Sequence, residues 1–501
     1  MICWSLSSPI GSHDDERFHI GSIWCADGYN ERCLPLKKTE RMEIAFLKVN
    51  LCTPQITEKE PLPLLIQQSK NSCRYEFQAN DDLEKFNHVK HFEQRNYIAS
   101  RFNETNYPTR YQKFMNSFIL DNTLLSILVM RNVNAFLMCL LFTILLIIAN
   151  SKIKNSFLLA ISFTVVPQGL FIASSINPSS WSYIGCTFSW VFLWIIVSAD
   201  QKFTVSNYVA FAGWVLASLL AISSRWDSPL WLIFTNLTVL SLRFLTKKSS
   251  LKITAIFSGA ALVSIIAYRL LGPPVLQSID PSLTSEFFEP WNLVMAIGGG
   301  AKLALATPMR ILGLEDFGWS QIQPPNEVFF GGVLCFVLLI SFLITFKEIR
   351  IKIFFLSFLL FFWMLCTSQV AKNPTWMYPF YLPRTGWSND LFHSRYFLPV
   401  FPFFIGAAAL ISPKREKLVE DSRFKNALIV ILTFTHAISL QSVGRIFRDN
   451  PSWYWPNFPI NIDLVLTLGS ISFFVFVLTV TKILRSVPSS SLLSLTFQCK
   501  I

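Results

Sequence analysis

The first stretch of the chain that could carry out chemistry is the heptapeptide HDDERFH at residues 13–19. It places Asp15 beside Glu16, with His19 one helical turn later. A carboxylate held at the edge of a membrane can act as a general base on an acceptor hydroxyl. Two other interpretations stay open. The acidic residues can complement the dipole of a helix that Ser12 caps, or Asp15 and His19 can contribute to a divalent metal site.

A metal site at Asp15 and His19 would need a third ligand. No third ligand follows Asp15 and His19 at a recognisable spacing, and the chain contains no CxxC pair of the kind that holds zinc. We therefore assign no metal ligands and no cofactor, and leave a divalent metal as an open option.

The composition indicates that these residues belong to a membrane protein. Of the 501 residues, 52% are hydrophobic and only 15% are charged, whereas about a quarter of an ordinary soluble protein is charged. The formal net charge of +12 does not indicate nucleic-acid binding, because the surplus lies in short connections between apolar runs rather than on a soluble face. We expect the lipid bilayer as a partner and no nucleic acid.

Eleven apolar runs are long enough to cross a bilayer, which requires about 20 largely apolar residues in a helix. They predict an all-α polytopic membrane protein. Pro167 lies inside the second run and should kink it, as membrane helices tolerate. The predicted spans cover residues 134–150, 156–175, 181–199, 204–223, 228–245, 252–271, 328–346, 352–371, 396–412, 425–441 and 463–482.

Lysine and arginine in the connections predict the orientation of the spans. Alternate connections, beginning with SKIKN at residues 151–155, are basic, and the intervening ones carry few Lys or Arg for their length. Placing the basic set in the cytoplasm puts the C-terminus inside. The chain then divides into an extracytoplasmic N-terminal region with the acidic motif, a helical block, an extracytoplasmic loop with an interfacial helix, a second helical block and a cytoplasmic tail. Their boundaries are residues 1–130, 131–271, 272–327, 328–485 and 486–501.

The N-terminal region has little regular pattern. Residues 37–70 show neither a sustained helical nor a sustained strand period, so we expect irregular structure there. The opening MICWSLSSPI is too short and too poor in basic residues to export this region as a signal peptide, and we expect that a first transmembrane helix is missing. Four cysteines, an even number, lie where disulfides can persist. Three pairings stay open among Cys25, Cys33, Cys52 and Cys73.

Short motifs along nearly the whole chain resemble, in the same order, those of a family of bacterial multi-pass membrane proteins, domain of unknown function 2142. SHDDERFH is similar to the family's Ser-Pro-Asp-Glu-x-x-His signature, with Asp15, Glu16 and His19 on its Asp, Glu and His. The other matching stretches are YPTRY at 107–111, MR at 130–131 just before the next helix, INPSSWSYIGCTFSW from 176, FGW at 317–319 and SRYFLPVFP from 394. With the family's first helix the intact pattern would have 12 spans.

The resemblance also implies a reaction, because this family is grouped with the C-type glycosyltransferase (GT-C) superfamily. Its members take sugar from a polyprenyl-phosphate carrier outside the cytoplasmic membrane and carry an acidic residue in the first outside loop. The implied function is transfer of a sugar to a glycan or cell-wall acceptor of the envelope. Asp15 would be the catalytic base, and Glu16 an alternate base or a group that orients the acceptor.

The leaving group of such a reaction is a lipid phosphate, which needs cations, and the fork of an arginine fits phosphate oxygens. The expected substrate-binding residues are His19, Tyr107, Arg131, Arg384, Arg395 and Tyr396.

A non-enzymatic membrane protein is the alternative: a transporter of lipid-linked saccharide, a scaffold of envelope assembly, or a truncated inactive family member. Transport requires charged or polar groups near the bilayer midplane. The predicted spans contain few, mainly Gln168, Asn207 and Asn236, while the carboxylates cluster outside them. This distribution favours chemistry at the membrane surface and leaves a scaffold open.

Overall fold

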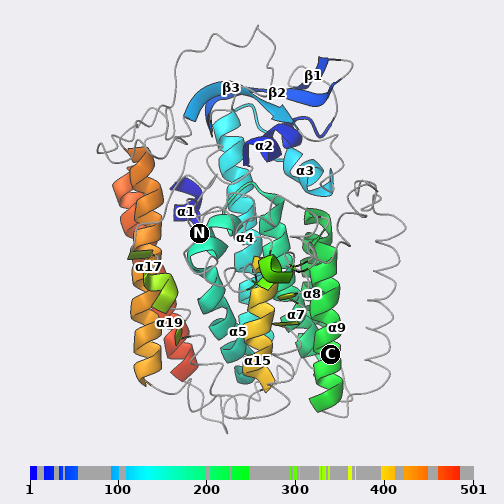
Figure 1. The fold of residues 1–501 in the computed structure, drawn as a ribbon, viewed down its shortest axis with the longest axis vertical. Helices are drawn as coiled ribbons and strands as arrows, with labels where there is room; N and C mark the ends of the chain where they lie inside the picture. Colours follow the sequence, from blue (N-terminus) through cyan, green and yellow to red (C-terminus); the bar gives the residue numbers. More distant parts are fainter. Residues whose placement is uncertain are drawn as a thin grey trace, which may run out of the picture.

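The chain, seen in a computed structural model, forms a bundle of helices with a small sheet across one end (Figure 1). The predicted span at 252–271 lies outside the described residues, as do most of 328–346 and 352–371. The described residues are 1–7, 16–27, 33–37, 40–54, 92–100, 109–198, 204–225, 227–246, 397–411, 422–448 and 461–485, with scattered residues between 294 and 367.

Five helices of the described part are long and apolar enough to cross a membrane. Two more, α9 (Ser228–Thr246) and α15 (Phe401–Ile411), fall on other predicted spans, α15 directly after a short 3-10 turn, η8 (Leu398–Val400). The prediction of a polytopic membrane protein built of α-helices is confirmed for the membrane bundle of the described residues, to which a small sheet is added. The five spanning helices are α4 (Thr123–Ile148), α7 (Pro178–Val197), α8 (Val205–Ser224), α17 (Ser422–Arg448) and α19 (Ile462–Arg485).

Helix α4 begins earlier than predicted. The apolar pattern starts the span near residue 134, with Arg131 ahead of it, but the helix begins at Thr123. Asn122 caps it, because its side chain accepts a hydrogen bond from the backbone N–H of Leu125 over 3.1 Å. Arg131 therefore lies two turns inside α4. An arginine does not mark the end of a membrane helix when a carboxylate of the same protein neutralises it, as Glu16 does for Arg131.

At Pro167, where the sequence predicts a kink, the regular α-helix is interrupted. Helix α5 (Ser151–Thr164) passes into a single π-helical turn, η3 (Val165–Gly169), and then into α6 (Leu170–Ala173). Proline has no N–H to donate to the preceding turn, and a widened turn is one way for a helix to accommodate it. A short turn follows, and Asn177 caps the next helix, α7.

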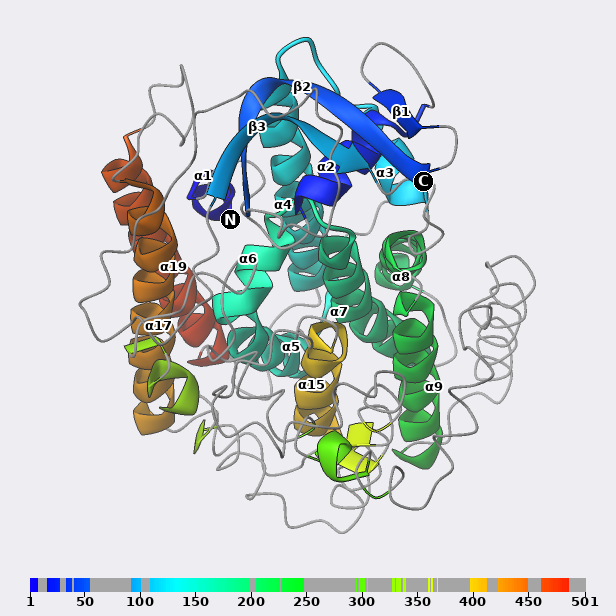
Figure 2. The ribbon, with the colours of Figure 1, turned by 45° about the horizontal axis from the view of Figure 1, so that its top comes forward.

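Three antiparallel strands lie over one end of the bundle in the order β1–β2–β3 (Figure 2). The expectation of irregular structure at residues 37–70 is wrong for the part that β2 occupies. The alternation of apolar residues in MEIAF (42–46) changes phase in LKVNL (47–51), where the pairing with β3 shifts register. Such a shift breaks the two-residue period that reveals a strand. The strands are β1 (Cys33–Lys37), β2 (Glu40–Pro54) and β3 (Phe92–Ser100).

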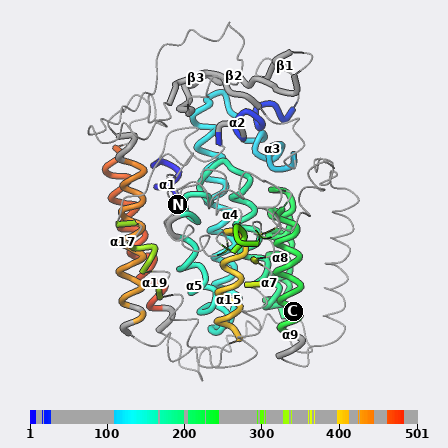
Figure 3. Tube along the Cα trace, in the orientation of Figure 1, coloured from blue at the N-terminus to red at the C-terminus, as the bar shows by residue number. Residues whose placement is uncertain are grey.

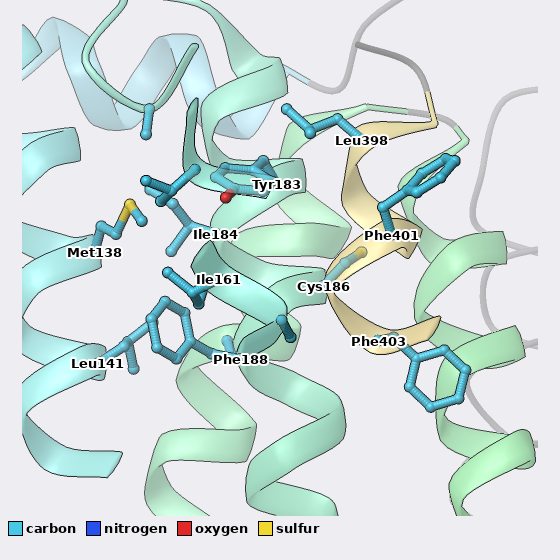
Figure 4. Close-up of a cluster of buried hydrophobic side chains, with 14 of the residues drawn as sticks. Met138, Leu141, Ile161, Tyr183, Ile184, Cys186, Phe188, Leu398, Phe401 and Phe403 are labelled. Carbon is cyan, nitrogen blue, oxygen red and sulfur yellow. The ribbon is translucent and has the colours of Figure 1, made fainter. Parts of the chain in front are cut away.

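Helix α7 forms the centre of the bundle, and every one of its residues is buried. In Figure 4, Ile184 and Phe188 of α7 lie among side chains of α4, α5 and the η8–α15 segment. Helix α8 packs closely on another face. A Cβ atom added at Gly185 would lie 2.5 Å from the carbonyl oxygen of Ala217 and 2.6 Å from the nitrogen of Ala221. Small residues allow such close approach of membrane helices.

Helices α17 and α19 pack together at one side of the bundle, next to the short first helix α1 (Ile2–Leu6) (Figure 3). The indole Nε1 of Trp4 donates a hydrogen bond to Nε2 of His436 over 3.0 Å. The His436 ring stacks on Phe473 with centroids 3.9 Å apart. The first helix is thus fixed to the C-terminal helix pair by a polar contact inside the protein.

Candidate functional site

The acidic motif meets an arginine of a membrane helix in a buried ion pair. Glu16 is the first residue of α2 (Glu16–Trp24), and Arg131 comes from α4. Nε of Arg131 donates to Oε1 of Glu16 over 2.9 Å, and Nη2 donates to Oε2 over 2.6 Å. Neither side chain is exposed to solvent. Paired hydrogen bonds between an arginine fork and a carboxylate are among the strongest in proteins, and they fix the relative orientation of α2 and α4.

Two backbone groups form further hydrogen bonds with this pair. Nη1 of Arg131 donates to the carbonyl oxygen of Ser5 over 2.7 Å, and the N–H of Ile176 donates to Oε1 of Glu16 over 3.1 Å. Ser5 belongs to α1, and Ile176 to the turn between α6 and α7. A pair of charges removed from water is tolerated when further hydrogen bonds satisfy it, as here. The pair therefore joins α1, α2, α4 and the α6–α7 turn at one point.

A second buried polar cluster lies one turn further along α4. Nδ2 of Asn134 donates to the carbonyl oxygen of Ser175 over 2.7 Å, and Oδ1 accepts from the indole Nε1 of Trp181 over 2.8 Å. The ring of Tyr111 packs edge-on against Trp181, with centroids 4.9 Å apart. Burial raises the pKa of the Tyr111 phenol, which stays neutral at physiological pH. This cluster carries no charge. It holds the backbone at Ser175, next to Ile176, which donates to Glu16 of the ion pair.

Helices α2 and α3 (Thr109–Asn116) are bound to each other above the bundle. The side-chain amide of Asn116 donates to the carbonyl oxygen of Ile23 over 2.8 Å. His19, on α2, is 3% exposed and thus enclosed by protein. Cys25, just after α2, is disulfide-bonded, as expected for a cysteine of the N-terminal region.

Motifs that are far apart in the sequence meet in the ion pair and in the uncharged cluster around Asn134, the two layers of the candidate site. Glu16 comes from the acidic motif, Tyr111 from YPTRY, Arg131 from MR, and Trp181 from the asparagine–proline stretch. The model of a family described as "Predicted membrane protein (DUF2142)" matches residues 1–404. The chain belongs to the DUF2142 family. No curated protein and no solved structure matches it.

The DUF2142 match contains the whole of both layers, while α17 and α19 follow it. Of the predicted site residues, the structure brings together Glu16 and Arg131 and buries His19 on the same helix as Glu16. The other predicted residues lie outside the described part of the chain: Asp15, Tyr107, Arg384, Arg395 and Tyr396.

The guanidinium of Arg131 is already bonded within the protein, unlike that of an arginine available to bind a phosphate. All three of its guanidinium nitrogens donate to protein acceptors, on Glu16 and Ser5. A contact of Arg131 with a lipid phosphate stays a prediction. Within the described residues, no group of three His, Cys, Asp or Glu side chains could hold a metal ion.

Sequence reasoning missed the polar groups that bind the ion pair or lie beside it. Asn134 carried a usable signal, because it is a polar residue in an apolar helix three positions after Arg131 and so shares its face. Ser5 and Ile176 carried none, since they contribute backbone atoms that every residue type possesses.

Proposed function

We propose that this chain is a C-type membrane glycosyltransferase that transfers a sugar from a polyprenyl-phosphate carrier to a glycan or cell-wall acceptor on the outer side of the cytoplasmic membrane. One observation carries the proposal. Glu16, the second residue of the acidic pair, begins a helix at the sheet end of the bundle and is bonded there to the membrane helix α4 (Figure 1). At this boundary the headgroup of a lipid carrier and an acceptor in water can meet.

The distribution of basic connections supports an outer location for this end. Helix α4 begins beneath the sheet and ends at the opposite end of the bundle, where the basic stretch SKIKN starts α5 (Figure 1). Basic connections mark the cytoplasmic side of a membrane protein. In this proposal the sheet, α2 and α3 lie outside, and the tail after residue 485 lies in the cytoplasm.

The proposed catalytic base is Asp15. Its carboxylate takes the proton of the acceptor hydroxyl while the hydroxyl oxygen forms a bond to the anomeric carbon. The bond from that carbon to the phosphate oxygen breaks, and the lipid phosphate leaves with the electron pair, so the anomeric configuration inverts. Arg384 and Arg395 are the proposed cations for the phosphate, and Tyr396 is a proposed hydrogen-bond donor.

Glu16 has a different proposed task. Both of its carboxylate oxygens already accept hydrogen bonds from Arg131, and one also accepts from Ile176. A carboxylate so occupied is a poor proton acceptor. We therefore assign Glu16 as a positioning residue that fixes the start of α2, directly after Asp15 in the chain.

A comparison of neighbouring carboxylates tests the proposal. The full chain is reconstituted in liposomes with a radiolabelled polyprenyl-phosphate sugar and an envelope glycan acceptor. Asp15→Asn should lower sugar transfer about 10²- to 10⁴-fold, the contribution typical of a general base. Asp14→Asn, which removes the adjacent charge, is the matched control and should transfer at the unaltered rate. Equal activity of the Asp15 and Asp14 variants would remove Asp15 from the mechanism.

The closed environment of the ion pair favours a second candidate, a non-enzymatic scaffold of envelope assembly. Glu16 and Arg131 are fully buried and bonded to each other, as in a purely structural joint. For a scaffold, no lipid-linked sugar would be consumed by the reconstituted chain, and deletion of the gene would alter envelope assembly without loss of one glycosidic linkage. Analysis of the glycans of a deletion strain distinguishes the two.

A further inference from the structure

One face of α3 carries two cations without an ion-pair partner among the described residues. Arg110 and Lys113 are both exposed, and neither forms a salt bridge within the described part of the chain. Phe114 is 43% exposed beside them. Residues 110, 113, 114 and 117 recur at intervals of three and four, so they share one side of the helix. Residues 109–120 contain no acidic side chain that could neutralise the two cations.

The opposite side of α3 is firmly attached to the protein. Tyr111 and Met115 are completely buried, and Gln112 is 3% exposed. The side chain of Asn116 is bonded to the backbone of Ile23 on α2. The helix therefore cannot turn its cationic side inward without breaking these contacts, and the exposure of the cations is built into the fold.

The helix lies at the depth where the membrane helices begin. Phe114 packs against Trp181 in the first turn of α7, with ring centroids 5.1 Å apart. After α3, the N–H of Leu120 donates to the hydroxyl oxygen of Ser126 in the first turn of α4 over 2.8 Å. Figures 1 and 2 show α3 between the sheet and the adjacent end of α8. An exposed face at this depth meets lipid headgroups.

We propose that Arg110 and Lys113 bind the headgroup phosphate of an anionic phospholipid, with Phe114 inserted at the boundary between headgroups and acyl chains. Basic residues on an interfacial helix attract anionic lipid, and an aromatic ring beside them is suited to the same layer. The arginine fork can hold two phosphate oxygens while the lysine supplies a second charge. This surface is separate from the acidic motif and stands independently of the proposed reaction.

Lipid binding to the full chain tests this surface. The chain, purified in detergent, is titrated with phosphatidylglycerol or phosphatidylcholine and examined by native mass spectrometry. Each cation near a membrane surface contributes about a fivefold factor, so the double variant Arg110→Gln with Lys113→Gln should weaken phosphatidylglycerol binding roughly 25-fold. Raising the salt concentration should weaken binding to the unaltered chain as well.

A matched control removes two cations from the opposite end of the bundle, Lys154→Gln with Lys482→Gln, and should keep the tightest phosphatidylglycerol site. Monodisperse elution and an unchanged helical circular dichroism spectrum show that both variants fold. Equal losses in the two double variants, or equal binding of phosphatidylcholine, would overturn the proposal. Displacement of phosphatidylglycerol by equimolar polyprenyl phosphate would also overturn it, and would assign the surface to a lipid carrier.

Discussion

Removal of one partner of the Glu16–Arg131 pair should destabilise the sheet end of the bundle severely. In Arg131→Met the side chain keeps its apolar stem, but the buried Glu16 carboxylate loses both hydrogen bonds of the guanidinium, while the N–H of Ile176 still donates to it. Breaking one side of a buried ion pair costs about 3–5 kcal/mol. Glu16→Gln removes the carboxylate that is paired with the buried guanidinium, and a loss of similar size is expected.

The double variant separates charge from shape. With Glu16→Gln and Arg131→Met together, both charges of the pair are removed, and the glutamine oxygen can still accept from Ile176. The carbonyl of Ser5 loses its donor, which costs about 1–3 kcal/mol. The two single losses together amount to about 6–10 kcal/mol, so the double variant should be more stable than their sum predicts, with a coupling free energy of at least about 3 kcal/mol.

The assay is reversible unfolding in mixed micelles, with dodecyl sulfate as the denaturant and circular dichroism as the readout. The free energies of unfolding of the four proteins give the coupling directly. Single variants that lose less than about 1 kcal/mol, the range of an exposed ion pair, would refute the reasoning. So would strictly additive losses, because they would show that the two charges do not interact.

Three further predictions concern packing and topology. Gly185→Ala should cost about 1–3 kcal/mol in the same unfolding assay, because its Cβ would overlap the backbone of α8; unchanged stability would contradict this packing. Trp4→Phe should cost about 1–3 kcal/mol by leaving Nε2 of His436 without a donor, and an unaffected protein would show that the bond is unimportant. A reporter fused after Arg415 should report cytoplasm and one within residues 372–386 the outside; the reverse result would invert the proposed topology.

The apolar runs predicted most of the described helices because hydrocarbon imposes a simple length requirement. The predictions for α7, α8 and α9 agree with the structure within a few residues. The start of α4 could not be predicted, since the charge of Arg131 is neutralised by a residue 115 positions away. Strand β2 could not be recognised from its sequence, because the alternation of apolar residues changes phase where the pairing with β3 shifts register.

The candidate site was predicted as separate residues and not as an arrangement. Glu16 and Arg131 stood out because charges are rare in an apolar chain, yet nothing in either motif indicates that the two side chains bind each other. The contacts to Ser5 and Ile176 depend on where the backbone runs, which side-chain types do not encode. Asn134 could have been recognised from its spacing after Arg131.

Helix α7 is enclosed by protein on all sides in the folded chain, but it must enter the membrane before its neighbours surround it. This segment must first enter lipid as an independent helix, since membrane helices insert before they associate. It is the least apolar of the five spanning helices and carries several hydroxyl groups. One of them, on Ser182, later accepts a hydrogen bond from Ser228 of α9 over 2.8 Å. Until the neighbouring helices pack around it, α7 is the least stably inserted of the five spanning helices. A defect in an adjacent helix would therefore expose α7 first to cellular quality control.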